Sequence, residues 1–360
     1  MDKYDFLQKT LVAFGNETRL SCSQAELEET DELAKKHKVD SIVKYVYSDP
    51  MTEKNCLLNK TDHLCRLTDC AGVFSKCEDR GIPYAVIKGA YLEKTAYKNK
   101  GVRSSNDLDL LIRKHDYKKV AEILVSEGFI CMSLDWKSRK YVECTDRARL
   151  LYNHLYSHQS CSFFKYRDED TYTKVDINFS ITWGEDPRGA SMSEDLLTKM
   201  VRKADYEGIT YNVLEPAAFL FQICLHSYRD MNSVLLQKRE KYKLARLCDV
   251  YYYIINKEEP VDVLSFVELV KHYSYEKPIY YMLYYASEFF GPNEWMNTAA
   301  EAIEPDDKKF LNEFGLSEGE KKVWPIDFRE RVLSEKLYEK IEFLIDENDR
   351  QKMSSIENNM

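Results

Sequence analysis

Glycine and proline are scarce in this chain of 360 residues, with 12 and 9 copies. So small a share of both excludes collagen-like chains and Pro/Gly-rich disordered chains. Long apolar runs are lacking as well, and the longest uncharged one, residues 217–225, is far too short to span a bilayer. The N-terminus, MDKYDFLQKT, is charged throughout and has no apolar signal core. We therefore expect a cytoplasmic protein without a membrane segment.

Short cysteine pairs are also missing, although there are ten cysteines. Zinc sites usually take their ligands from closely spaced pairs such as CxxC, and the chain has none. Four cysteines lie within one stretch at wider spacings: Cys56, Cys65, Cys70 and Cys77. The other six are scattered: Cys22, Cys131, Cys144, Cys161, Cys224 and Cys248. The sequence therefore predicts reduced, partly buried thiols.

The composition is that of a compact, largely helical protein. Apolar residues make up 44% of the chain and charged residues 31%, which is enough apolar material for a sizeable core. The formal net charge of −9 argues against nucleic acid as a partner, although it allows a local basic site. A cationic small molecule suits this overall charge better.

The hydrophobic pattern divides the chain into three parts and a tail. Residues 1–60 have helical patterns, residues 61–190 mix helix and strand patterns, and residues 191–350 return to helices. We expect residues 351–360 to fray. Strand patterns lie at 84–87, 107–112, 129–134, 139–143, 150–157 and 172–181, and helical patterns at 62–80, 91–97, 116–127, 238–257, 261–274, 277–290 and 327–346. The expected fold class is α+β, with a small mixed sheet between helical N-terminal and C-terminal regions.

Two aspartates on one strand are the first candidates for chemistry. Asp107 and Asp109 project to the same face of the strand, while Leu108, Leu110 and Ile112 point into a core. Carboxylates so close repel each other unless a cation neutralises them. A hard divalent ion, most simply Mg²⁺, does so and also bridges nucleotide phosphates. The alternative is an exposed edge strand with two solvated aspartates.

The surroundings of this pair strengthen the case for a nucleotide site. Upstream, a strand ends in Lys88-Gly89-Ala90 before a helix, and glycine lets the backbone approach a phosphate closely. Lys88 and Arg103 are cations close enough in sequence to reach a triphosphate. Downstream, Asp176 lies centrally in another strand, where it could complete a two-metal site or take a proton from a hydroxyl. Each residue also has an ordinary structural reading, as a turn glycine, a solvated cation or a buried aspartate.

At this point the sequence resembles a family. The segments AVIKGAYLEKTAY, GVRSSNDLDLLI and KVDINF resemble the uncharacterised nucleotidyltransferase family of the DNA polymerase β superfold. That family has a strand ending in LKG-small, then RxxxDxDLL, then a strand with VDLH. Leu225-His226 and the segment from Arg246 to Asp249 are similar to its helical region. The resemblance covers residues 62–250.

The resemblance implies Mg²⁺-dependent transfer of a nucleoside monophosphate, AMP from ATP in our expectation, with release of pyrophosphate. By this resemblance, Asp107, Asp109 and Asp176 are expected to hold two Mg²⁺ ions. Gly89 and Ala90 stand where the superfold has its phosphate-binding Gly-Ser turn.

Three features depart from the superfold's pattern. Ala90 lacks the hydroxyl of the usual serine, and Asn178 stands where a histidine often follows VDL. The gap between Ala90 and Asp107 is also longer than in compact members. None of these departures removes a metal-binding carboxylate.

The acceptor is open to several hypotheses. Our first choice is a small molecule, because the chain is acidic and shows no basic RNA-binding surface. The enzymatic alternative is a peptide, a protein or a tRNA end. A further alternative is a non-catalytic protein that keeps the fold to bind a nucleotide or a partner.

Other candidates carry weaker patterns. His154 and His158 have metal-ligand spacing on a helix, but the segment lacks the glutamate of HExxH. His226 fits either a hydrogen-bonded core residue or a contact between the helical region and the site. One short basic run contains Trp136, Lys137, Arg139 and Lys140, and is typical of a solvated face.

Overall fold

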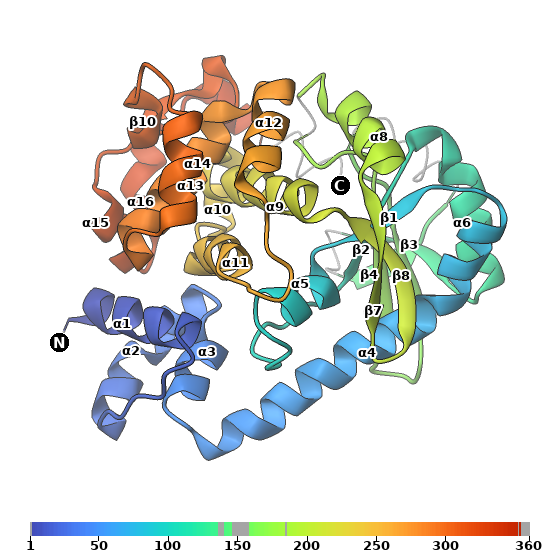
Figure 1. Cartoon of the computed structure of the whole chain (residues 1–360), viewed down its shortest axis with the longest axis horizontal. Coiled ribbons are helices and arrows are strands. Elements are labelled where there is room, and N and C mark those ends of the chain that lie inside the picture. Colours follow the sequence, from blue (N-terminus) through green and yellow to red (C-terminus); the bar gives the residue numbers. More distant parts are fainter. Residues whose placement is uncertain (1, 136–139, 146–157, 184–185, 352, 354–360) are drawn as a thin grey trace.

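Capping residues set the boundaries of the N-terminal helices in the computed structural model, which describes residues 2–135, 140–145, 158–183, 186–351 and 353 (Figure 1). Ser23 and Glu26 form a capping box at the start of α2 (Gln24–Lys36). Asp49 caps the 30-residue helix α4 (Pro50–Asp79), and Pro50 occupies its first turn without losing a hydrogen bond. The remaining helices of this region are α1 (Lys3–Gly15) and α3 (Asp40–Val46).

Helix α4 is longer than the helix expected at 62–80. It begins at Pro50, crosses residue 60 and runs beneath the sheet, so one continuous helix joins the N-terminal helices to the strands (Figure 1). The ring of Phe74 on α4 stacks on Tyr84 with 5.4 Å between centroids. The Asp69 carboxylate, also on α4, accepts a hydrogen bond from Thr173. α4 therefore covers one face of the sheet.

Eight strands of the described chain form one mixed sheet, in the order β4-β3-β5-β6-β2-β1-β8-β7. β2 is parallel to β6 and β1 to β8, whereas the other neighbours are antiparallel. The strands are β1 (Tyr84–Ile87), β2 (Leu108–Ile112), β3 (Ile130–Asp135), β4 (Lys140–Glu143), β5 (Ser162–Tyr166), β6 (Tyr172–Asn178), β7 (Val201–Tyr206) and β8 (Ile209–Leu214). The α+β class with a mixed sheet is confirmed, while the strand expected at 150–157 lies outside the described residues.

Strands β7 and β8 correct the expectation that only helices follow residue 190. They form an antiparallel hairpin that extends the sheet beside β1. The two turn residues, Glu207 and Gly208, both have positive φ, 51° and 83°, as the tight turn of a twisted hairpin requires. The strand pattern of β7 is weak in the sequence, because only Tyr206 of this strand is buried and Arg202, Lys203 and Asp205 are charged. Strand β5 was likewise not expected.

Helices make up most of the remaining described residues. The helices between the strands are α5 (Gly89–Thr95), α6 (Tyr117–Ser126) and α8 (Gly189–Lys199). Those that follow the sheet are α9 (Pro216–Asn232), α10 (Val234–Lys238), α11 (Leu244–Ile254), α12 (Val263–Tyr273), α13 (Glu276–Phe290) and α14 (Glu294–Ala302). The single helix expected at 327–346 is instead divided into α15 (Phe328–Leu333), α16 (Leu337–Ile341) and a 3₁₀ turn (Glu342–Leu344), because Ser334 is extended, with ψ of 116°. Two short strands, β9 (Glu313–Phe314) and β10 (Lys322–Val323), pair separately.

The first helix packs against the C-terminal helical region. Figure 1 shows α1 beside the C-terminal helices, where Gln8 donates a hydrogen bond to the carbonyl of Phe289 at 2.7 Å. Of the tail expected to fray, Met353 is buried, and residues 352 and 354–360 lie outside the described residues. Among the described residues, none of the helices combines the length and apolar character that a membrane crossing requires.

Candidate active site

Three carboxylates gather where β2 and β6 meet the helical region. Asp109 and Asp176 are directly opposite each other in the parallel pairing of these strands. Asp107 lies just before β2, two residues from Asp109, and turns to the same side. All three line one cavity of about 670 Å³. The sheet thus brings together the carboxylates that the sequence singled out.

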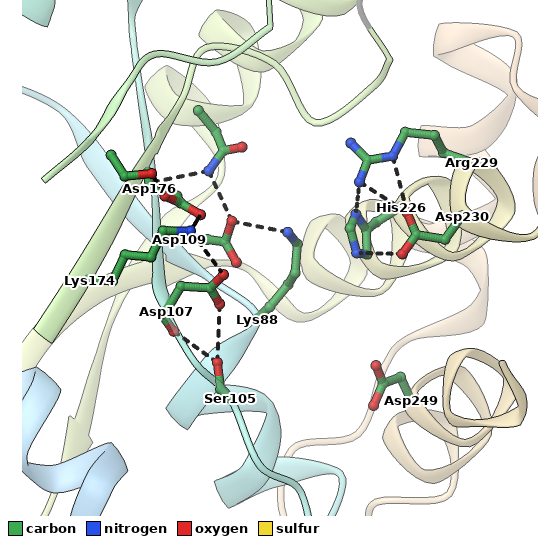
Figure 2. A network of polar contacts seen from close by, with 12 residues as sticks. Lys88, Ser105, Asp107, Asp109, Lys174, Asp176, His226, Arg229, Asp230 and Asp249 are labelled. Atoms are coloured by element: carbon green, nitrogen blue, oxygen red, sulfur yellow. Dashed lines mark hydrogen bonds and ion pairs between the residues drawn. The ribbon is translucent and has the colours of Figure 1, made fainter. Parts of the chain in front are cut away.

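Two lysines neutralise part of this negative charge (Figure 2). The Lys88 ammonium lies 3.2 Å from Asp109. Lys174 lies 2.8 Å from Asp176 and 3.9 Å from Asp107, and so bridges them. Sequence reasoning missed Lys174, although its position two residues before Asp176 places both side chains on the same face of β6.

The carboxyl groups respond differently to this environment. Burial, together with the charges of Asp107 and Asp109, raises the pKa of Asp176 to about 6 despite the opposing effect of Lys174. Burial also disfavours the charged form of Asp107, but Lys174 and Lys88 outweigh it and hold the pKa of Asp107 below its usual value. At Asp176 the charge of Lys174 therefore does not outweigh burial and the two neighbouring carboxylates.

Neutral hydrogen-bond donors orient the same carboxylates. The Ser162 hydroxyl donates to Asp176 at 2.5 Å, and the Asn178 amide donates to Asp109 at 3.1 Å. Ser105 donates to the backbone carbonyl of Asp107 at 2.8 Å. Asn178, which stands where the family often has a histidine, thus helps to fix one of the three carboxylates.

The turn after β1 brings backbone close to these side chains. Lys88 and Gly89 both adopt positive φ, 67° and 53°, and the backbone carbonyl of Asp107 lies 3.8 Å from the place a Gly89 side chain would take. Lys88 and Gly89 line the cavity. Ala90, predicted together with them, is buried beside the turn and is not among the lining residues.

Arg103 lines the cavity but is committed to an ion pair. Its guanidinium donates to both carboxylate oxygens of buried Asp249 on α11, at 2.9 and 3.2 Å. The Tyr97 hydroxyl donates to Asp249 at 2.6 Å. The Glu93 carboxylate accepts from the backbone amide of Arg103 at 2.9 Å, and burial raises the pKa of Glu93 to about 8. Arg103 therefore ties the sheet region to the C-terminal helices.

A second polar network faces the carboxylates across the cavity (Figure 2). His226 accepts a hydrogen bond from Arg229 at 3.0 Å through Nδ1, and its Nε2 lies 3.5 Å from Asp230. Arg246 lies 2.6 Å from Asp230. Burial lowers the pKa of His226 well below its usual value. His226 is thus a neutral link between the helical region and the site.

Carboxylates on adjacent strands beside a glycine turn are the arrangement expected for nucleotidyl transfer. Residues 32–291 match the uncharacterised nucleotidyltransferase family. The chain belongs to this family. The match is wider than the stretch 62–250 that carried the resemblance, and it includes every strand of the main sheet. No curated protein matches the chain significantly.

The donor set of this nucleotidyltransferase fits Mg²⁺. Asp107, Asp109 and Asp176 offer only carboxylate oxygens, the ligands that a hard divalent cation prefers. Two lysines against three carboxylates leave one negative charge without a partner in this cluster. A cation shared by these side chains would neutralise it.

Three further lysines of the nucleotidyltransferase line the same cavity without an ion-pair partner among the described residues. They are Lys38, which precedes α3, and Lys241 and Lys243, which precede α11. Burial, with repulsion from Lys36, lowers the pKa of Lys243 to about 8. Burial and nearby cations, including Lys241, also lower the pKa of Lys38. Sequence reasoning missed these lysines, because they come from separate, ordinary charged segments.

The remaining candidates from the sequence are the pair His154 and His158 and the short basic run. His158 is partly buried at the cavity, and this burial lowers its pKa to about 4, whereas its expected partner His154 lies outside the described residues. Of the short basic run, only Lys140 is described, and it is exposed on β4.

Proposed function

We propose that this nucleotidyltransferase transfers AMP from ATP to a hydroxyl or other nucleophile of a small-molecule acceptor, releases pyrophosphate, and needs Mg²⁺. One observation carries the proposal: Asp109 and Asp176 face each other on β2 and β6, with Asp107 beside them in one cavity. The choice of ATP as donor and of a small molecule as acceptor is the one already made from the sequence.

The acceptor and the triphosphate can each be matched to residues of the cavity. The acceptor oxygen attacks the α-phosphorus, the bond from that phosphorus to the bridging oxygen breaks, and pyrophosphate leaves. Asp176 takes the acceptor's proton, a role for which a pKa near 6 is well suited. Lys88 offsets charge on the phosphates, and Gly89 allows them close to the backbone. Bound Mg²⁺ would supply the positive charge that brings the triphosphate and the acceptor oxygen together and acidifies the acceptor.

The basic side of the cavity supports binding of an anionic nucleotide. Lys38, Lys241 and Lys243 repel one another and gain a partner when phosphate oxygens enter. Arg103 is held in the cavity wall by its ion pair with Asp249, so its charge is not freely available to the nucleotide. A volume of about 670 Å³ suits small ligands better than a polymer.

Calorimetry with each NTP, with and without Mg²⁺, tests the proposal. We expect Mg²⁺-dependent binding of ATP to the wild type and its loss in the D107N/D109N double variant. The matched control is D168N/D170N, which removes two charges from the exposed β5–β6 turn. Mass gain on candidate acceptors then tests transfer.

Two results would change the conclusion. Nucleotide binding without transfer to any acceptor would indicate a binding protein that keeps the fold. Transfer to a peptide, a protein or a tRNA end would replace the small-molecule acceptor, and strong salt dependence would identify the tRNA.

A further inference from the structure

Three cysteines converge at the end of the sheet that carries β3, β4 and β5. The sulfur atoms of Cys131, Cys144 and Cys161 all lie within 4.8 Å of one another. Those of Cys144 and Cys161 are 3.4 Å apart. None of the three forms a disulfide. Among the described residues no other three potential metal ligands, the three aspartates included, have their ligand atoms within 4.8 Å of one another.

Strand register explains why the three meet. Met132 on β3 pairs with Glu143, so the antiparallel register places Cys144 opposite Cys131. The amide of Cys144 donates to the carbonyl of Cys131 at 2.8 Å, in agreement with this register. Met132 also pairs with Ser162, so Cys161 lies opposite Ser133, which is two residues from Cys131 on β3.

The same register places all three side chains on one face. Residues directly opposite each other share a face, as do residues two apart on one strand. Cys131, Cys144 and Cys161 therefore point to the same side of the sheet. The next residue after Cys161, Ser162, turns to the other side and donates to Asp176. The thiols are thus separated by the sheet from the carboxylates of the candidate active site.

The spacing of the sulfurs suits a shared soft cation. In a tetrahedral zinc site with Zn–S bonds of about 2.3 Å, two sulfurs lie roughly 3.8 Å apart. The Cys144–Cys161 distance of 3.4 Å and the 4.8 Å within which all three sulfurs lie are compatible with this value, and no two of the sulfurs are bonded. Cys161 is buried, whereas Cys131 and Cys144 are partly exposed, so an ion has a route to the cluster.

We propose that Cys131, Cys144 and Cys161 bind one Zn²⁺ ion as three thiolates. The fourth position of the tetrahedron is left for water or another small ligand. The ion would fasten β4 and the start of β5 to β3. The proposal does not depend on nucleotidyl transfer, because its ligands lie on the other face of the sheet from the carboxylates.

Metal analysis of the full chain, purified without chelator, tests the site. We expect about one zinc per chain in the wild type and none in C144S. C65S is the matched control, because Cys65 is also partly exposed but lies on α4 and is not a member of the cluster, and it should keep the metal. The D107N/D109N variant should also keep it, which separates this site from the proposed Mg²⁺ site.

Cobalt substitution provides a readout that does not depend on a variant's folding. We expect Co²⁺ added to the zinc-free wild type to give a thiolate-to-cobalt charge-transfer band that saturates at one ion per chain. The band should be absent in C131S and C161S and present in C65S. A wild type that holds no zinc and gives no such band would overturn the proposal, and so would a disulfide between two of the three cysteines in the freshly purified protein.

Discussion

Asp109 and Asp176 are cross-strand partners on the parallel strands β2 and β6. They lie on the face of the sheet turned away from α4, since Tyr84 and Thr173 contact that helix from the opposite face. Parallel strands place corresponding residues side by side without a connecting turn. Two carboxylates that are far apart in the chain thereby share one cavity.

Asp176→Asn should separate activity from stability. Burial disfavours the ionised form of Asp176, so a neutral amide of the same shape removes an unfavourable charge. We expect nucleotidyl transfer to fall by at least about a hundredfold, the scale of general-base catalysis. The midpoint of thermal unfolding without Mg²⁺ should stay the same or rise. The control D170N, in the exposed turn, should change neither; a large drop in the D176N midpoint would contradict the account.

Breaking the Arg103–Asp249 ion pair should destabilise the fold. Asp249→Ala leaves the largely buried Arg103 guanidinium without its bidentate partner, at a cost of about 3–5 kcal/mol. Asp31→Ala removes a partly exposed ion pair with Lys35 and should cost less than about 1 kcal/mol. Urea unfolding measures both values. Equal losses in the two variants would show that the Arg103–Asp249 pair does not hold the sheet to α11.

Gly101 should tolerate alanine far less well than Gly81. Both have positive φ, 77° and 62°, so alanine strains the backbone at either position by about 1–2 kcal/mol. At Gly101 the added Cβ would also lie 2.1 Å from the carbonyl oxygen of Cys56, whereas at Gly81 it meets nothing within 4 Å. We expect G101A to lose at least about 2 kcal/mol more than G81A in urea unfolding, because backbone must move. Similar losses of unfolding free energy in G101A and G81A would show that the backbone at Gly101 does not lie this close to Cys56.

Acid should destabilise the protein through its buried histidines. Burial lowers the pKa of His37 to about 3 and that of His63 to about 4. Nδ1 of His37 accepts from the amide of Leu244 at 3.0 Å, and its Nε2 lies 2.7 Å from the Val332 carbonyl, which fixes the neutral form. Below pH of about 6.5 these histidines take up protons in the unfolded chain but stay neutral in the folded chain. The free energy of unfolding therefore falls as pH falls.

The free energy of unfolding between pH 7.5 and 5 measures this effect. Each buried histidine contributes up to about 1.4 kcal/mol per pH unit below about 6.5. His37→Gln should reduce the slope by that amount, whatever its effect on absolute stability. His115→Gln, at an exposed position, is the control and should change the slope less than His37→Gln does. An unchanged slope in H37Q would contradict the assignment.

The lysines before α11 should bind nucleotide phosphate. Removing both charges in K241Q/K243Q is expected to weaken ATP binding roughly tenfold or more, the scale of hydrogen bonds to charged groups. The salt dependence of binding should also become shallower. Lys118→Gln/Lys119→Gln, on exposed α6, is the matched control. If ATP binding is unchanged and only turnover with the acceptor falls, these lysines serve the acceptor instead.

The sequence by itself determined the fold class and most of the carboxylate site. Asp107 and Asp109 share a side because side chains alternate along a strand, and that is a local rule. The turn at Gly89 follows equally from nearby residues. The same rule would have found Lys174 beside Asp176, since the two are two residues apart on β6.

Only the tertiary structure decided which distant residues meet. Arg103 looked like a free cation, but α11 brings Asp249 against it. Cys131 and Cys161 looked unrelated, but the register of β3 and β5 places them on one face. These contacts depend on strand order and helix packing, which arise from long-range burial rather than local spacing. For that reason the sequence could predict the residues of the β2 strand end, but not the partners that the fold assembles around them.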